Sequence, residues 1–394
     1  MMKRSFATLL LISLMLAGCG TKPGAPAVPA PQAPEPPAPE PPAPFGLLAV
    51  SNPTVLTMDQ LSDMLARDLN EAGVPPAERL RAIFEGWYSG GKPNIVEVDL
   101  DGDHAAEIIT AMRMGGNGRP LTGAGALFII YKDGSQWAVD RSPGDEIVGV
   151  DLHEATDLTG DGTPEIIWGA TNAGAHTVHH SVFVSQWQPD ALKTLPGDMK
   201  MTYMQLTVDG KDLVLHGGMI GSAGAGPQRA RTDRYRWSGG EMRLVDRAYA
   251  PDPLGYWRLI DGIVHEQFGR VDQAEQAYRD AMDPAREVAP ADMIKPEQAA
   301  TFPEAVRTMA RMRLAWLLIR RSPPVDAGPV IEGASGPFAG LVEAFSLSSS
   351  VQGSCPMAAD WARSHPDFVD ALNGVFGYAN EIWSPTVLCG NLPV

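Results

Sequence analysis

One pattern occurs three times between residues 94 and 250, and this repeat constrains the fold more than any other feature of the chain. Each copy alternates short runs of β-branched and aromatic residues with turns that contain Gly, Asp or Pro, which is typical of short β-strands. Asp99, Asp157 and Gln205 stand at matching positions of the three copies. Each copy is long enough for about four strands, so the sequence predicts three four-stranded β-units in residues 93–250.

The most informative segment of the repeat is an acidic loop. In the first copy it reads Asp99-x-Asp101-Gly102-Asp103-x-x-x-Glu107. Calcium takes about 6–8 oxygen ligands, and carboxylates at alternate positions of a tight loop can supply them. An EF-hand is excluded, because that loop requires glycine at the sixth position and glutamate at the twelfth, where this chain has His104 and Thr110. The sequence therefore predicts a calcium loop of another kind.

The corresponding loop of the second copy has fewer carboxylates. Its candidate ligands are Asp157, Thr159, Asp161, Thr163 and Glu165. Three carboxylates against four predict weaker binding than in the first loop. The third copy is shorter, and we expect no metal at its Gln205, Thr207, Asp209 and Asp212. For each loop the alternative is an Asp-Gly hairpin turn whose carboxylates are solvated.

The repeat with its acidic loop resembles the FG-GAP or VCBS-type blade of integrin-α-like β-propellers. The resemblance implies a structural Ca2+ that is bound by the side chains of Asp99, Asp101, Asp103 and Glu107 and by the carbonyl of Ala105. It also implies a partial or open β-propeller, because three blades are fewer than the usual ~4–8 of a closed one. Either a degenerate further blade completes the ring, or the array is open and residues 45–92 are a candidate cover.

The N-terminus has the features of an export signal. Lys3 and Arg4 precede an apolar run, and small residues stand before Cys19. The segment Leu-Ala-Gly-Cys resembles the lipobox of bacterial lipoproteins, which implies removal of residues 1–18 and lipid on Cys19; the alternative is an ordinary secretory signal. The resemblance implies an extracytoplasmic protein of the cell envelope, anchored to a membrane by lipid. Half of residues 23–44 are proline, so residues 19–44 are expected to form an extended stalk.

Helices are expected on both sides of the repeat. The apolar periodicity of residues 45–92 predicts a helical hairpin, and residues 251–394 are expected to be mainly helical. In the latter segment Gly262, His265, Gly269, Ala274, Tyr278 and Ala281 have a spacing that resembles a single tetratricopeptide repeat. With Cys19 lipidated in an oxidising compartment, we expect Cys355 and Cys389 to form a disulfide; the alternative is two buried thiols.

The composition limits the classes of partner. The formal net charge is −16, and phosphate binding requires a basic patch, so nucleic acid is not an expected partner. The sequence predicts that the longest loop of each copy follows its second strand, and repeat symmetry would bring these loops to one binding rim. The candidate rim residues are Asn117, Arg119, His176, His179, His180, Gln228, Arg229 and Arg231. The three histidines are expected to be polar surface residues and not zinc ligands, because on a strand they do not converge.

These features favour a calcium-stabilised binding or scaffold protein of the cell envelope, with a protein or a glycan as its ligand. The sequence contains no motif that identifies catalytic residues. The alternative is a glycosidase-like envelope hydrolase whose catalytic residues come from distant loops. A pocket with two carboxylates about 5–9.5 Å apart, away from the calcium loops, would favour that alternative.

Overall fold

The structure is a computed structural model. It describes residues 58–85, 94–113, 125–142, 149–174, 176–188, 191–286, 300–348, 351–373, 377–380 and 382–390. All described residues belong to one compact unit, which lies within residues 44–394. Cys19, the stalk, Asn117 and Arg119 lie outside the described residues. In the described part of the chain, no helix combines the length and the apolar character that a membrane-spanning segment requires.

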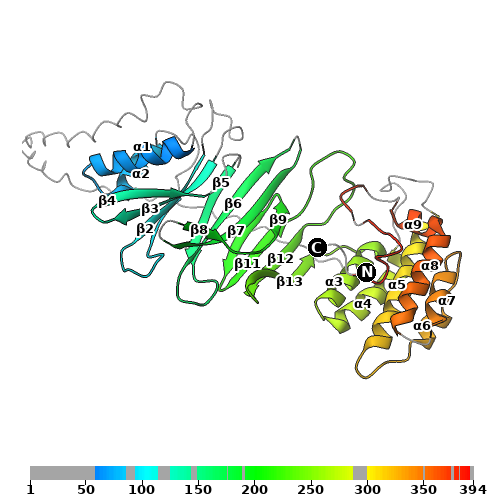
Figure 1. The fold of residues 1–394 in the computed structure, drawn as a ribbon. Coiled ribbons are helices and arrows are strands. Elements are labelled where there is room, and N and C mark those ends of the chain that lie inside the picture. Colours follow the sequence, from blue (N-terminus) through cyan, green and yellow to red (C-terminus); the bar gives the residue numbers. More distant parts are fainter. Residues whose placement is uncertain are drawn as a thin grey trace, which may run out of the picture. The chain divides into compact units, whose positions relative to one another are not determined.

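The described strands form three antiparallel sheets, one for each copy of the repeat (Figure 1). The first sheet contains β1 (Ile95–Val98), β2 (Glu107–Arg113), β3 (Gly125–Asp133) and β4 (Gln136–Arg141). The second contains β5 (Gly149–Thr156), β6 (Glu165–Ala173), β7 (Val178–Gln188), β8 (Ala191–Thr194) and an additional strand, β9 (Met199–Thr202), which pairs with β7. The third contains β10 (Gln205–Asp209), β11 (Asp212–Gly217), β12 (Arg231–Ser238) and β13 (Glu241–Tyr249). The prediction of three β-units is confirmed, with a fifth strand in the second.

The third copy is shorter than the sequence comparison of the repeats indicates. Asp99 and Asp157 directly follow the last residues of β1 and β5, whereas Gln205 is the first residue of β10. The residue that follows β10 is Gly210, in a turn of two residues that joins β10 to β11. The matching of Gln205 with Asp99 is therefore wrong, because the third hairpin closes directly and has no room for an acidic loop.

The three sheets pack through two apolar layers. Residues of the first and second sheets, among them Ile129 and Trp168, share one cluster. Residues of the second and third sheets, among them Val184 and Leu213, share another. The described strands form no closed sheet, so the β-region is an array of three packed sheets.

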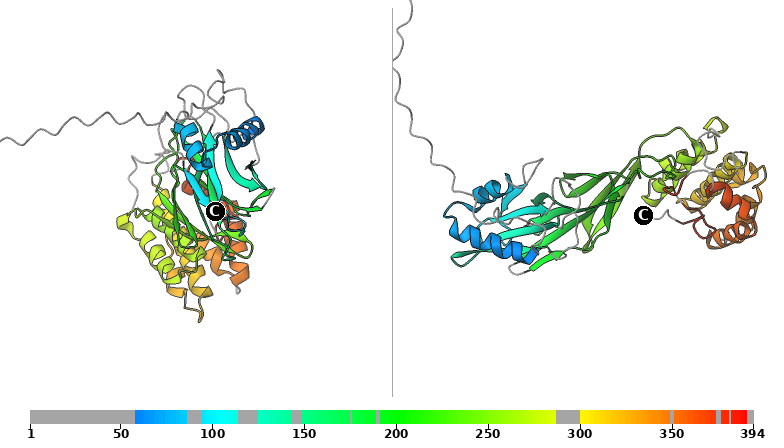
Figure 2. Two further views of the ribbon diagram at one scale, coloured as in Figure 1. Left: turned by 90° about the vertical axis from the view of Figure 1, so that its left-hand side faces the viewer. Right: turned by 90° about the horizontal axis from the view of Figure 1, so that it is seen from above.

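Two helices cover the remaining face of the first sheet. They are α1 (Met58–Glu71) and α2 (Pro76–Glu85), and the reversal between them contains Gly73 at a φ of +64°, which glycine adopts without strain. Their apolar faces pack on Phe128 and Ile130 of β3, and Figures 1 and 2 show α1 beside β3 and β4. Asn70 of α1 also bonds both backbone groups of Trp137 on the edge strand β4. The predicted hairpin thus covers the sheet and protects its edge.

The C-terminal region is helical, as predicted. It contains α3 (Gly255–Gln267), α4 (Val271–Ala281), α5 (Phe302–Arg320), α6 (Gly328–Glu332), α7 (Gly340–Ser346), α8 (Val351–Ser364) and α9 (Pro366–Asn373), with a 3-10 turn at Pro284–Arg286. The helices α3 and α4 form a hairpin in which Gly262 faces Tyr278. A Cβ on Gly262 would overlap with that ring, so only glycine permits this crossing.

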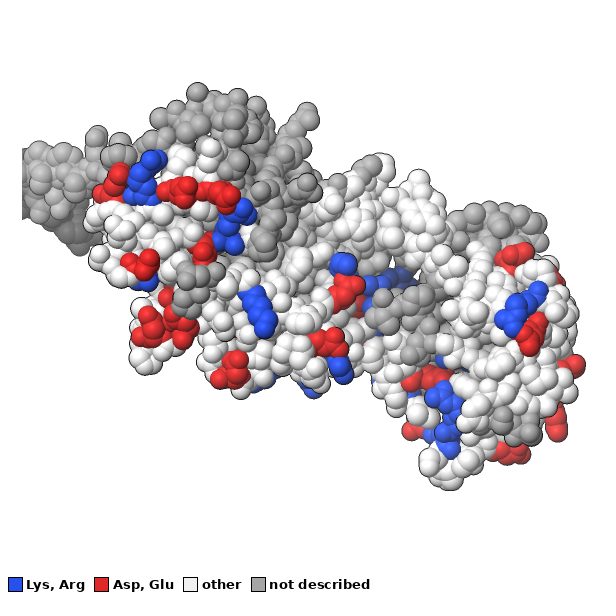
Figure 3. Space-filling model, viewed as in Figure 1, with Lys and Arg blue, Asp and Glu red and all other residues white. Residues whose placement is uncertain are grey.

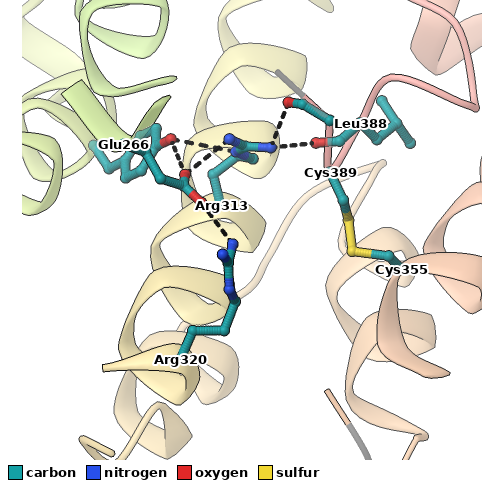
Figure 4. Close-up of a disulfide and its surroundings, with 8 residues drawn as sticks. Glu266, Arg313, Arg320, Cys355, Leu388 and Cys389 are labelled. Carbon is teal, nitrogen blue, oxygen red and sulfur yellow. Dashed lines mark hydrogen bonds and ion pairs between the residues drawn. A yellow bond between two sulfur atoms is a disulfide. The ribbon is translucent and has the colours of Figure 1, made fainter. Parts of the chain in front are cut away.

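A disulfide fixes the C-terminal segment to this helical region. Cys355 of α8 is bonded to Cys389 across a Cα–Cα distance of 6.0 Å, which confirms the predicted pair. Beside it, the buried Arg313 of α5 donates to the carbonyls of Leu388 and Gly390 and forms an ion pair of 2.8 Å with Glu266 of α3 (Figure 4). Covalent and ionic contacts therefore hold the same segment.

Candidate metal centre

The first candidate site is the loop between β1 and β2. Glu107, the first residue of β2, is only 3% exposed, and its Oε2 accepts a hydrogen bond of 2.7 Å from the backbone of Leu100. Asp99 accepts backbone N–H groups of residues 102 and 104 through its two oxygens. These bonds shape the loop so that Asp99, Asp101 and Glu107 each bring one carboxylate oxygen within 4.8 Å of the others. Three of the predicted ligands therefore converge.

Asp103 does not belong to this group in the described structure. Its Oδ1 accepts a hydrogen bond of 2.6 Å from the backbone of Ala105, which holds the loop but points the carboxylate to a local partner. The expectation of four converging carboxylates is thus met by three. Ala105 enters the hydrogen bonds of the loop through its N–H group, and its carbonyl remains the predicted ligand.

The second candidate site has the same plan between β5 and β6. One oxygen each of Asp157, Asp161 and Glu165 lies within 4.8 Å of the others. Glu165 begins β6, is fully buried, and accepts backbone N–H groups of Leu158 and Thr159. Because both loops present three converging carboxylates, the difference in ligand number that the sequence predicts is not found in the two clusters.

Neutral groups donate hydrogen bonds to the carboxylates of the second cluster. The hydroxyl of Thr159 donates to Glu165 Oε1 at 3.0 Å, and Thr163 donates its backbone N–H to Asp161. Gln186 of β7 donates to both Glu165 and Asp161. The sequence analysis did not identify Gln186. The strand pairing reveals it, because Ile166 pairs with Ser185 and the next residue pair in the same register is Glu165 with Gln186.

The two loops also share an unusual backbone. Their fourth residues, Gly102 and Gly160, have φ values of +81° and +85°, and their sixth residues, His104 and Gly162, have values of +70° and +94°. This left-handed conformation is natural for glycine and strained for other residues. The repeated backbone supports one common loop structure for the two copies.

The carboxylates of the first loop are in electrostatic conflict. Burial raises the pKa of the Glu107 carboxyl above its ordinary value, and the charges of Asp101 and Asp103 raise it further, whereas the N–H of Leu100 lowers it. A cation among the carboxylates would remove this conflict. Asp, Glu and hydroxyl oxygens are hard ligands of the type that Ca2+ and Mg2+ prefer, so both clusters fit a divalent metal ion by their donor chemistry.

No protein-family model, curated protein or solved structure matches this chain. The chemistry of the two loops must therefore be judged from their own residues and geometry.

The predicted rim residues are mostly held in other roles. In the second copy the connection after the second strand is a short turn, in which His176 lies, while His179 and His180 belong to β7. The prediction of a long loop at this position in every copy is therefore wrong. Of the described residues of the rim, no set of three histidines or acids forms a metal-binding cluster.

In the third copy the rim residues stabilise the fold. Gln228 bonds both backbone groups of Ile220 and so closes its own loop. Arg229 is buried, forms an ion pair of 2.8 Å with Asp261 of α3, and lies over the ring of Trp257. Arg231 pairs with Asp233 beside it in β12. Arg229 therefore cannot serve on an exposed rim, because its guanidinium is buried between β13 and α3.

Three cavities are lined by described residues of the C-terminal region. The largest, about 560 Å³, lies beside the start of α4 and is lined by Arg270, Arg320 and Arg321, which have acidic partners in Asp246, Glu266 and Glu275. None of these three cavities is lined by a pair of carboxylates in the described residues. They therefore offer no support for a glycosidase.

Proposed function

We propose that the protein is a lipid-anchored, extracytoplasmic binding or scaffold protein whose β-region is stabilised by calcium. The observation that carries the proposal is the pair of equivalent loops, each with three converging carboxylates in a backbone of the same shape. If the carboxylates of a turn were only solvated, they would not be expected to converge around a buried glutamate. Mutual repulsion would drive them apart unless a cation compensates their charge.

Calcium suits these loops better than a transition metal does. All converging donors are oxygens, and neither cluster contains a histidine or cysteine. Three carboxylates leave coordination positions for water, for the carbonyl of Ala105 and for Thr163, and Ca2+ accepts such irregular sets more readily than Mg2+ does. Bound there, the ion would supply charge compensation and would cross-link β1 with β2 in the first sheet and β5 with β6 in the second.

The N-terminal sequence supports the location. The export signal, the lipobox-like residues before Cys19 and the proline-rich segment 19–44 together favour a lipid anchor with a stalk. The disulfide between Cys355 and Cys389 adds support, because such bonds persist in oxidising compartments. On the face shown in Figure 3, acidic and basic side chains are interspersed. His176 and His179 are exposed and remain candidates for such a contact.

A thermal and urea melt with calcium or with chelator tests the calcium proposal. Calcium at 100 times its dissociation constant should add about 2.7 kcal/mol per site that binds only the folded chain. Asp101→Asn should remove the contribution of the first loop. Asp133→Asn is the matched control, because it removes the same charge from an exposed position at the end of β3, outside the acidic loop and the converging group. Melts that are indifferent to chelator would show that the loops are only turns.

The location has its own test. Intact-mass analysis of membrane-extracted protein should show a chain that begins at Cys19 with a diacylglycerol group. Cys19→Ala should release the protein from membranes. A variant that still sediments with membranes would refute the lipid anchor without bearing on calcium.

A further inference from the structure

The first two strands of all three sheets are joined at the same structural position, and a carboxylate begins the second strand each time. Val98 pairs with Glu107 in the first sheet, Thr156 with Glu165 in the second, and Asp209 with Asp212 in the third. Asp212 is therefore the structural counterpart of the two buried glutamates. Its side chain is only 6% exposed.

The second and third of these connections also lie close together. A Cβ on Gly160, in the second acidic loop, would lie 2.5 Å from Nζ of Lys211 in the third turn. The three carboxylates are thus comparable in strand register, and the last two connections are neighbours in space.

Two guanidinium groups neutralise Asp212. Arg236 donates from Nε to Oδ1 at 2.5 Å and from Nη2 to Oδ2 at 2.7 Å, which is a bidentate pair. Arg234 donates from Nη1 to Asp212 at 2.9 Å and to Asp209 at 2.8 Å. These bonds lower the pKa of the Asp212 carboxyl, with Arg236 as the main cause.

The matching positions of the other two sheets hold neutral residues. In the third sheet Arg236 pairs with Asp212. In the second sheet the same register places Gln186 opposite Glu165. In the first sheet it places Tyr131 opposite Glu107, because the preceding residue Ile130 pairs with Ile108. Arg234 pairs with the third residue of β11. Its counterparts are Ile129 and Val184, which pair with the third residues of β2 and β6. Only the sheet without an acidic loop has arginines at both positions.

We propose that Arg234 and Arg236 replace the calcium ion in the third sheet, so that metal dependence is confined to the first two. The inference rests on the proposed calcium function. A guanidinium is bound covalently to the chain and always charged, so removal of calcium cannot discharge it. Loss of calcium loosens the β1–β2 and β5–β6 hairpins, and the β10–β11 hairpin remains closed.

Hydrogen exchange of the full chain, with calcium or with chelator, tests this division. Calcium at 100 times its dissociation constant should slow exchange in the β1–β2 and β5–β6 hairpins by up to about 100-fold and leave β10–β11 unchanged. The double variant Arg234→Gln/Arg236→Gln should exchange at least about tenfold faster in β10–β11, with and without calcium. Arg243→Gln is the matched control, because Arg243 is exposed on β13 and pairs only with the exposed Glu241 among the described residues.

A rescue separates charge compensation from general damage to the sheet. Asp212→Asn added to the double variant should restore much of the protection of β10–β11, because the uncompensated carboxylate is then absent. Protection of β10–β11 by calcium in the unchanged chain would overturn the inference and leave the calcium proposal intact. Normal exchange of β10–β11 in the double variant would also overturn it. No effect of calcium on any hairpin would refute the calcium proposal and with it the replacement.

Discussion

The charges of acidic groups with little solvent exposure are compensated differently in the first two sheets and in the C-terminal helical region. In the helices, Glu266 is matched by Arg313, whose side chain is 1% exposed, and by the more exposed Arg320. In the first two sheets, Glu107 and Glu165 accept hydrogen bonds from the backbone, and none of the ion pairs found among the described residues involves either carboxylate. The helical region is neutralised by its own side chains, whereas the first two sheets would, under the calcium proposal, require a cation from outside the chain.

The largest expected effect is in the helical region. Arg313→Met should lower the free energy of unfolding by about 3–5 kcal/mol, because Glu266 and the hydroxyl of Tyr278 lose a buried partner. Urea denaturation followed by circular dichroism measures the loss. Arg320→Met is the control, since Arg320 is half exposed and should cost no more than about 1 kcal/mol. Equal effects of the two changes would contradict the assignment of Arg313 as the main partner.

Removal of the disulfide should have the next largest effect. Cys355 and Cys389 are 34 residues apart, and closure of a loop of this length contributes about 3–4 kcal/mol in the chain-entropy model. The double variant Cys355→Ser/Cys389→Ser should lose this amount equally with calcium and with chelator. Calorimetric scans under both conditions measure it. A loss that depends on calcium would mean that the helices and the sheets unfold as one unit, contrary to the independence that is expected of the two regions.

A histidine of the second sheet should make the β-region sensitive to acid. Burial lowers the pKa of His153 below its ordinary value, and His180 lowers it further, while Asp151 opposes the shift. At pH values above the unfolded-state pKa of about 6.5 both states are neutral, so the effect is absent. Below it the unfolded chain binds the proton more readily than the folded chain does, so the free energy of unfolding decreases as the pH is lowered.

His153→Gln should flatten this acid dependence between about pH 7 and pH 5, which urea midpoints across that range measure. His179→Gln is the control, because His179 is exposed on β7 of the same sheet. An unchanged slope in His153→Gln would show that other groups cause the acid sensitivity.

The fold was predictable from the sequence where information is local. Strand alternation predicted the three sheets, the apolar periodicity predicted α1 and α2, and the acidic spacing in one short loop predicted the convergence of Asp99, Asp101 and Glu107. In each of these cases the pattern that carries the prediction lies within one strand, one helix or one short loop.

The remaining features depend on strand register and on packing between distant segments. Asp212 and Arg236 are 24 residues apart, and Arg313 and Glu266 are 47 apart, so no local pattern connects them. The error at Gln205 has a related cause, because a turn of two residues replaces the acidic loop, and of the third copy's candidate ligands only Asp212 keeps the position of its counterparts Glu107 and Glu165. Arg229, predicted for a rim, is buried for the same reason: its partner Asp261 belongs to another region.

The smallest expected effect concerns the strain in the first loop. His104 has a φ of +70° at a position where the second loop has Gly162, and its side chain is 95% exposed, so its 3.7 Å contact with Asp99 contributes little. His104→Gly removes the strain but increases the entropy of the unfolded chain, so a net stabilisation of about 0.5 kcal/mol is expected. Gly162→His should destabilise the second loop by about 1 kcal/mol. Urea midpoints in excess calcium measure both, and destabilisation by His104→Gly would show that the side chain of His104 supports the loop more than its backbone strains it.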